Sequence, residues 1–398
     1  MARRTIYLGL LAIVIPYLYD RYVALSALAA NRPSKLKDVY NFRQHEFKFR
    51  DSIRNCEDVL LVEEKGLAIV SCDAGRDRWN TVMGTFAQHK GVVGGGLYVY
   101  DYATPGLSEQ DALARLTLKN IDTEDFHPLG IEYERKSGTL YVVNHAQTGS
   151  VIEIFDLDFK TTTATRRQTF RHALAFSPNS IQALGDGKIF FTNDHFIPAA
   201  MSPILSKIET FSGVPGGSVV YVDLTRPSET ARTLARVPFA NGIAMLNSST
   251  LAVASTSKSG IYFFSVTADY HLQSKNHISP PEYHLKSQGY IRTPVAPDNI
   301  SVDGNGKLLM AGHPFALATM KVSRGRANCD PDSRKEEDRK ACDCTAAGWV
   351  AEWTPETGLR ELYKGYDICT SSTAVRDVGR GIGLVTGLYD RGLMLFKE

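Results

Sequence analysis

Six stretches of this 398-residue chain repeat one pattern. Each is a short apolar strand, a tight turn rich in Gly, Lys, Asp or Ser, and a second apolar strand, which is the signature of a β-hairpin. The stretches begin at Glu57, Leu129, Asn179, Asn241, Asp298 and Ser372. Hairpins that recur every 50 to 74 residues, with further strands between them, predict an all-β fold, a six-bladed β-propeller.

Four of these stretches open with a residue able to bind a hard metal ion: Glu57, Asn179, Asn241 and Asp298. Alone, each would be interpreted as a turn former. Their shared phase in the repeat instead predicts a ring at one depth around the central tunnel. With Asn299, the ring offers two carboxylates and three amide oxygens, a donor set that suits Ca²⁺ rather than zinc.

Composition agrees with a soluble domain of this kind. Hydrophobic residues make up 43% of the chain, and the 32 glycines and 17 prolines suit a protein with many turns. The formal net charge is +2, from 45 basic and 43 acidic residues. With no concentrated basic face, we expect no nucleic-acid partner. Six blades of about 40–50 residues each would use most of the chain as one closed domain.

The N-terminus is expected to lie outside the propeller. Arg3 and Arg4 precede an apolar run from Ile6 to Tyr19, which Asp20 and Arg21 interrupt. Residues 1–30 therefore predict a signal peptide or an uncleaved signal anchor, with entry into the secretory pathway and possible membrane association. The alternative is a buried amphipathic helix. A lead-in segment would follow at residues 31–55, and the propeller at 56–398.

The six cysteines fit an oxidising compartment. Three of them lie in a charged insert, residues 324–347 or its edge, where a disulfide-stapled loop is favoured over a metal clip. Cys56 and Cys72 flank the first hairpin and could face each other. Asn247 begins a glycosylation sequon on a hairpin turn. Residues 199–215 are apolar at helical intervals, which predicts a helix or a lid over one face.

Several motifs resemble the serum paraoxonase/arylesterase family. They are Cys56-Glu-Asp-Val59, Phe126-His-Pro-Leu-Gly-Ile131, Val142-Val-Asn-His145, Thr192-Asn-Asp-His195, Phe239-Ala-Asn-Gly-Ile243 and Asp298-Asn-Ile-Ser-Val-Asp303. The resemblance covers roughly residues 55–315 in matching order. It implies a six-bladed propeller, a retained N-terminal hydrophobic segment and calcium-dependent hydrolysis of lactones, aryl esters and organophosphates.

The resemblance also implies roles for single residues. The catalytic calcium would be held by Glu57, Asn179, Asn241, Asp298 and Asn299. A second, structural calcium would use Asp58 and the backbone carbonyl of Ile131, but its remaining aspartate is Ser180 here, and losing a carboxylate weakens such a site.

The histidines depart from the family pattern as well. The second member of the family's histidine pair matches His145, whereas the first falls at Leu129. His127, two residues earlier, would partly replace it. His195 and His313 end corresponding hairpins and are candidate pocket residues. The family's disulfide between the two ends of the chain has no counterpart, because no cysteine follows Cys369.

Three functions follow from these residues. The favoured one is a lactone or aryl-ester hydrolase, in which calcium polarises the carbonyl and His145 accepts the proton of the attacking water. The second is a non-hydrolytic pathway enzyme on a strictosidine synthase-like propeller, for which Leu129 leaves room. The third is a propeller that binds a partner, with calcium only structural. The expected ligand of an enzyme is a small-molecule ester or lactone.

Overall fold

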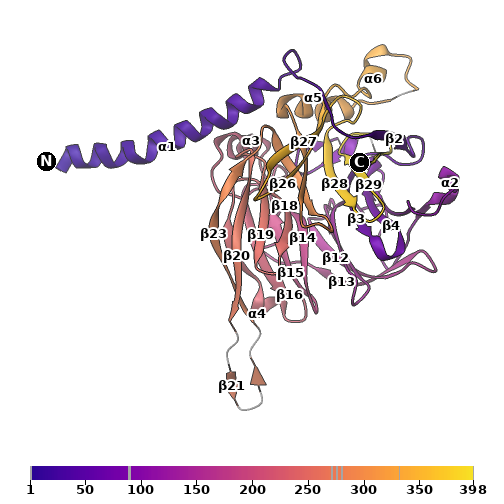
Figure 1. Ribbon diagram of the computed structural model, residues 1–398, viewed down its shortest axis with the longest axis horizontal. Coiled ribbons are helices and arrows are strands. Elements are labelled where there is room, and N and C mark those ends of the chain that lie inside the picture. The colour runs from indigo at the N-terminus through magenta and orange to yellow at the C-terminus, as the bar shows by residue number, and fades with distance from the viewer. Residues whose placement is uncertain are drawn as a thin grey trace.

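The protein is a six-bladed β-propeller with a long N-terminal helix (Figure 1). The computed structural model describes residues 2–87, 91–269, 272–274, 277–278, 281–330 and 332–397. The innermost strands of consecutive blades contact each other in chain order, and the innermost strand of blade six contacts that of blade one, so the ring is closed.

Each blade is an antiparallel sheet of four strands, and each runs from the axis outwards. Blade one is β3 (Cys56–Val62), β4 (Leu67–Cys72), β7 (Gly96–Asp101) and β8 (Leu113–Arg115). Blade two is β10 (Pro128–Glu134), β11 (Thr139–Asn144), β12 (Val151–Asp158) and β13 (Thr163–Phe170), extended by the parallel strand β9 (Thr117–Lys119). Blade three is β14 (Pro178–Gly185), β15 (Lys188–Asn193), β16 (Ser218–Asp223) and β17 (Arg232–Arg236).

The other three blades follow the same plan. Blade four is β18 (Ala240–Asn247), β19 (Thr250–Ser255), β20 (Gly260–Asp269) and β23 (Glu282–Arg292). Blade five is β24 (Ala296–Val302), β25 (Leu308–His313), β26 (Gly348–Thr354) and β27 (Gly358–Gly365), extended by β1 (Val39–Tyr40). Blade six is β28 (Ser371–Asp377), β29 (Ile382–Gly387), β30 (Leu393–Lys397) and β2 (Gln44–Lys48). Two small sheets lie outside the blades: β5 (Trp79–Asn80) with β6 (Thr85–Phe86), and β21 (Leu272–Ser274) with β22 (His277–Ile278).

Strands from the two ends of the chain close the ring. β2 pairs antiparallel with β30, from Gln44 opposite Lys397 to Lys48 opposite Leu393. The ring of Phe42 stacks on that of Phe396 with 4.0 Å between centroids, and Phe396 is fully buried. Pairing covers the edge that β30 would otherwise expose. Part of the segment between residues 31 and 55 is thus built into blades five and six.

The core lies between neighbouring blades. One cluster, for example, joins Val62, Ile69 and Leu97 of blade one to Ile131 and Phe155 of blade two. Alternate residues of each strand face one neighbour or the other, so strands buried on both faces are almost wholly apolar. This packing fixes the spacing of the innermost strands around the axis.

Five helices and two short 3-10 segments stand apart from the blades. The helices are α1 (Ala2–Ala30), α2 (Glu109–Ala112), α3 (Pro203–Ser212), α4 (Pro227–Thr230), α5 (Ala316–Arg326) and α6 (Glu336–Lys340), of which α4 only links two strands; the 3-10 segments are η1 (Glu63–Lys65) and η2 (Ala74–Asp77). The predicted lid is α3, begun by a hydrogen bond from the Leu205 amide to the side chain of Ser202 and ended by Gly213 at a φ of 65°. In Figure 1, α3 and α5 lie at the same end of the blades.

Helix α1 projects from the propeller (Figure 1) and is long and apolar enough, over Gly9–Ala30, to cross a membrane. Length and composition alone are weak evidence for a span. The two charges that interrupt the apolar run bind the propeller instead. Asp20 pairs with Lys258 and Arg292, and Arg21 donates to the Ser257 carbonyl.

All six cysteines are paired: Cys56 with Cys72, Cys329 with Cys342, and Cys344 with Cys369. The insert is therefore stapled by one disulfide and tied to the segment before β28 by another. Of the two sequons, Asn247 is exposed at the turn between β18 and β19, whereas Asn299 is buried.

The cysteine pairing gives a first prediction. Protein from its natural source, denatured without reductant, is expected to contain no free thiol. Cys344→Ser should leave one reactive thiol, that of Cys369, and should lower the free energy of unfolding by about 2–4 kcal/mol because a 25-residue loop is opened. A thiol assay on the denatured protein measures the first value and denaturant titration the second. Six free thiols in the wild-type protein would contradict both the pairing and an oxidising compartment.

Candidate metal centre and pocket

The innermost strand of every blade is irregular at the same place. The register with the next strand shifts between Cys56 and Asp58, Pro128 and Ile131, Pro178 and Ile181, Ala240 and Ile243, Pro297 and Ile300, and Ser371 and Thr373. A β-bulge re-aims the side chains that it contains. The six bulges hold the residues that begin the repeats in the sequence, so the predicted ring residues lie at equivalent positions near the start of each innermost strand.

Four of the five predicted ring residues leave a buried oxygen without a hydrogen-bond partner, among the described residues. These oxygens are Glu57 Oε2, Asn179 Oδ1, Asn241 Oδ1 and Asn299 Oδ1. The rest of the ring is bound internally: Asn241 Nδ2 donates to Asp298 Oδ1 at 2.6 Å, and Asn299 Nδ2 donates to Glu57 Oε1 at 2.7 Å. Orphaned buried oxygens are rare and costly. Amide and carboxylate oxygens gathered in this way fit a hard divalent cation such as Ca²⁺.

The electrostatics of the ring agree with this fit. Burial, together with the negative charges of Asp58 and Asp298, raises the pKa of Glu57 well above its ordinary value, and the Arg76 guanidinium only partly opposes that rise. A cation among these carboxylates would remove the cause of the shift. Asp298 has a further partner, because its Oδ2 lies 3.0 Å from His313 Nε2.

Two blades supply no ligand to the ring. Leu129 of β10 and Ser372 of β28 stand at the bulges of blades two and six. Leu129 is buried and packs with Tyr141, Val143 and Ile181. Its neighbour Gly130 lies so close to β14 that an added Cβ would be 2.3 Å from the carbonyl oxygen of Asn179. Glycine therefore lets the innermost strands of blades two and three approach at the level of the ring.

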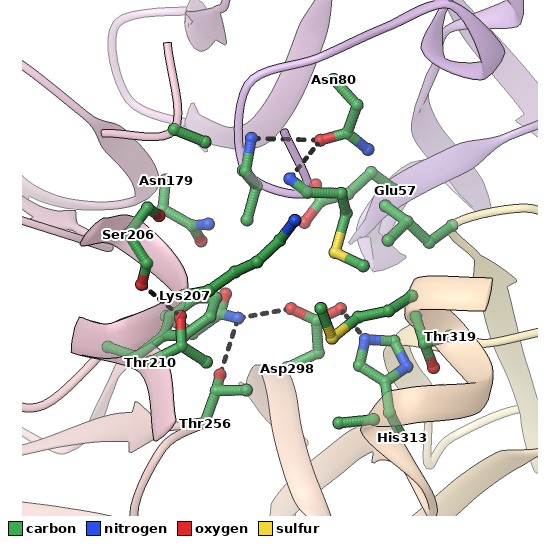
Figure 2. Close-up of a pocket in the computed structure, with 18 of the residues that line it drawn as sticks. Glu57, Asn80, Asn179, Ser206, Lys207, Thr210, Thr256, Asp298, His313 and Thr319 are labelled. Atoms are coloured by element: carbon green, nitrogen blue, oxygen red, sulfur yellow. Dashed lines mark hydrogen bonds and ion pairs between the residues drawn. The ribbon is translucent and has the colours of Figure 1, made fainter. Parts of the chain in front are cut away.

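The ring forms the floor of a pocket, shown in Figure 2. Helices α3 and α5 border it, and its walls are mostly apolar. The lining includes Val82, Met83, Leu129, Phe211, Phe239, Met320 and Leu388, along with Glu57, Asn179, Asn241, Asp298 and His313. Two cationic residues that the sequence did not single out, Arg76 and Lys207, also line it. Lys207 lies on the predicted lid, but nothing in its sequence context marks it as an inward-facing residue.

The residues expected to hold a second ion are arranged differently. The Asp58 carboxylate accepts hydrogen bonds from the amides of Val59 and Ile131 and from the Thr373 hydroxyl. Burial raises the pKa of Asp58 to about 6, although these three bonds act to lower it. Ser180 supplies no carboxylate, and no oxygen of Asp58 is left without a partner. This cluster does not call for a cation as the ring does.

The structure places His145 beside the ring rather than in the pocket wall. Its Nε2 lies 2.6 Å from the carbonyl oxygen of Pro178, the residue before Asn179, and its Nδ1 is bound to the Thr81 hydroxyl. Neither ring nitrogen is open to a water molecule in the pocket. The sequence-based prediction of its proton-accepting role therefore meets a geometry that suits support of the Asn179 segment. Burial lowers the pKa of His145, although the bond to Pro178 and the charge of Asp194 act in the opposite direction.

The remaining two histidines have different partners again. His127 is buried behind the pocket, with Nδ1 3.2 Å from Asp73 Oδ2 and Nε2 3.9 Å from Asp125 Oδ1. His195 joins blade three to the lid, since its Nδ1 lies 2.9 Å from Asp194 Oδ1 and its Nε2 2.7 Å from Thr210 Oγ1 of α3. Of the four candidate histidines, His313 is the one in the pocket lining.

Comparisons with known proteins agree with one family. A profile of the arylesterase family matches residues 85–334. Serum paraoxonase/arylesterase 2 of Rattus norvegicus is 26% identical over 319 residues, 78% of this chain and 80% of that protein. The Canis lupus familiaris protein of the same name is 27% identical over 201 residues, 49% of this chain and 51% of its own, so this match spans about half the length of that relative.

One relative and one solved structure widen the comparison. Serum paraoxonase/lactonase 3 of Oryctolagus cuniculus is 29% identical over 208 residues, 51% of this chain and 53% of that protein. A gluconolactonase structure from Xanthomonas campestris aligns with a TM-score of 0.49 at 16% identity, over 93% of this chain and 92% of that one.

The position of His145 gives a second prediction, on stability against pH. Its folded-state pKa lies below the unfolded value of about 6.5, so the unfolded chain binds more protons in the range just below that pH. His145 therefore stabilises the fold above about pH 6.5, and this contribution is lost as the pH falls. The difference in unfolding free energy between wild type and His145→Gln should shrink by up to about 1.4 kcal/mol from pH 6.5 to pH 5.5. Denaturant titrations at these two pH values measure it, and an unchanged difference would contradict the assignment.

Proposed function

This chain belongs to the arylesterase family, and we propose that it hydrolyses lactones or aryl esters with calcium as its metal. The observation that carries the proposal is the set of four buried, unpartnered oxygens on the floor of an apolar pocket. A partner-binding propeller has no need of unpartnered oxygens beneath an open pocket. A small apolar ester whose carbonyl reaches the floor would suit it.

Glu57, Asn179, Asn241, Asp298 and Asn299 would hold the ion. When bound, calcium would polarise the ester carbonyl and stabilise the negative charge that develops on its oxygen. The apolar walls around Leu129, Phe211 and Phe239 would hold the substrate and limit the entry of water. Because the Asp58 cluster lacks an unpartnered oxygen, the proposal involves one ion.

The proton of the attacking water is assigned to the Asp298–His313 pair. The two side chains are 3.0 Å apart, and both line the pocket. Asp298 would accept the proton at Oδ2, and His313 would share it through Nε2, since histidine titrates near neutrality. His145 would act as a positioning residue, holding the Pro178–Asn179 segment through its Nε2. His127 would support the same wall from behind, through Asp73.

The N-terminal helix and the disulfides support a proposal about location. We propose that the chain enters the secretory pathway, as a secreted or membrane-anchored protein, and that Asn247 carries a glycan. A glycosidase-induced change in mass that is absent from Asn247→Gln tests both points together.

The calcium site gives a third prediction. Asp298→Ala removes one of two carboxylates from the ring, and the affinity for calcium should fall by about 100-fold or more, with loss of hydrolysis. Asp51→Ala, at a carboxylate that is 96% exposed, is the matched control and should change neither. Calorimetric titration of calcium into chelator-treated protein measures the affinity, and a screen of lactones and aryl esters measures activity. Unchanged affinity in Asp298→Ala would refute the site.

The histidines give a fourth prediction. His313→Gln should lower kcat/KM for a responsive lactone by about 10²–10⁴-fold, because proton transfer is impaired. His145→Gln should act mainly on stability and calcium affinity, and kcat at saturating calcium should fall far less. The pH profile separates the two roles: the lower limb should change in His313→Gln and persist in His145→Gln. The reverse result would return the proton-accepting role to His145.

A further inference from the structure

Two cationic side chains share the pocket with the ring. Arg76 comes from η2, the short 3-10 segment after β4, and Lys207 comes from the lid helix α3. Figure 2 shows the Lys207 side chain running from α3 across the pocket, with its ammonium group turned toward Glu57. Both groups therefore face the space in which a substrate would lie.

Neither cation has a carboxylate partner. Among the described residues, no ion pair within 4.0 Å involves Arg76 or Lys207, and the nearest acids belong to the ring. The Arg76 side chain is 3% exposed, and its one printed bond runs from Nη2 to the Pro128 carbonyl at 2.8 Å. Its Nε is buried and has no hydrogen-bond partner. A buried guanidinium donor left unpaired is costly, so a ligand that accepts from it would be favoured.

The charge balance of the pocket indicates what that ligand is. Its titratable lining residues are Glu57, Arg76, Lys207, Asp298 and His313. Without an ion, the two carboxylates offset the two cations. With a divalent ion in the ring, the carboxylates are balanced by the metal, and Arg76 and Lys207 are left as uncompensated positive charges beside it. In a mostly apolar pocket this repulsion is poorly screened.

We propose that the loaded pocket selects esters or lactones that carry a carboxylate besides the scissile group, and that Lys207 and Arg76 bind this carboxylate. The inference rests on the proposed function, which it deepens by naming a substrate class. The Arg76 guanidinium supplies a fixed buried donor, and Lys207 supplies a mobile charge from the lid. Apolar walls at Val82, Met83 and Phe239 take the body of the molecule.

This arrangement couples anion binding to the metal. The carboxylate would relieve the repulsion that the ion creates, so ion and carboxylate should each bind more tightly when the other is present. A neutral ligand of the same shape has no such coupling. The difference between a charged and a neutral ligand thus reports on Lys207 and Arg76 without any catalytic turnover.

The test uses two lactams, which resemble lactones in shape and resist hydrolysis. The probes are 6-oxopiperidine-2-carboxylate and its primary amide, titrated by calorimetry into the calcium-loaded full-length protein. Wild type is expected to bind the carboxylate at least about tenfold more tightly than the amide. Lys207→Met should abolish most of this preference, and Lys207→Arg should retain it. Lys321→Met, at an exposed lysine on α5 outside the pocket lining, is the matched control and should keep the wild-type preference.

A second arm tests the coupling. Chelator should weaken binding of the carboxylate more than binding of the amide. Equal affinity for the two lactams, no binding of either, or an unchanged preference in Lys207→Met would each overturn the inference. If esters are hydrolysed while the charge preference is absent, the proposed function stands and this inference fails. If Lys207-dependent carboxylate binding occurs while no ester or lactone is hydrolysed, the binding site stands and the proposed function fails.

Discussion

The structure depends on the convergence of side-chain oxygens on the propeller axis. Bulges in the innermost strands turn Glu57, Asn179, Asn241 and Asn299 toward one another, and each keeps one oxygen without a partner. An unsatisfied buried polar group costs about 1–3 kcal/mol, so four would cost roughly 4–12 kcal/mol. That sum is comparable with the whole stability of a typical domain, about 5–15 kcal/mol. A bound cation would offset this cost, which ties the stability of the ring to its ligand.

The same constraint explains why the ring must be closed. The ligands come from blades one, three, four and five, so their spacing depends on every blade interface around the axis. β2 completes blade six by pairing with β30, and Thr373 of β28 binds Asn299 and the Glu57 carbonyl across that last interface. Blade six gives no ligand to the ring, yet it fixes the distance between two that do.

Much of the fold and the ring could be predicted because both are periodic. A ligand that recurs at one phase of a repeat is at one depth in a propeller, whatever the distance along the chain. Lys207 and Arg76 have no such signal: one is a lysine in an amphipathic helix, and the other belongs to a short turn, so only the packing of α3 and η2 brings them to the pocket. His145 was located correctly by its motif, but its hydrogen bonds depend on Thr81 and Pro178, residues 64 and 33 positions away. Sequence spacing does not encode those contacts.

The substitution at Leu129 can be understood from the symmetry of the ring. In a closed ring of six blades, blade two lies opposite blade five, so Leu129 faces the side of the pocket that holds Asp298 and His313. Leu129 offers no group that could move a proton, and it packs into the core between blades two and three. Proton transfer in this chain therefore falls to the opposite wall, where a carboxylate and an imidazole lie 3.0 Å apart. An apolar wall facing a polar one also orients a substrate, because its apolar body is favoured beside Leu129 and its reacting carbonyl beside the ring.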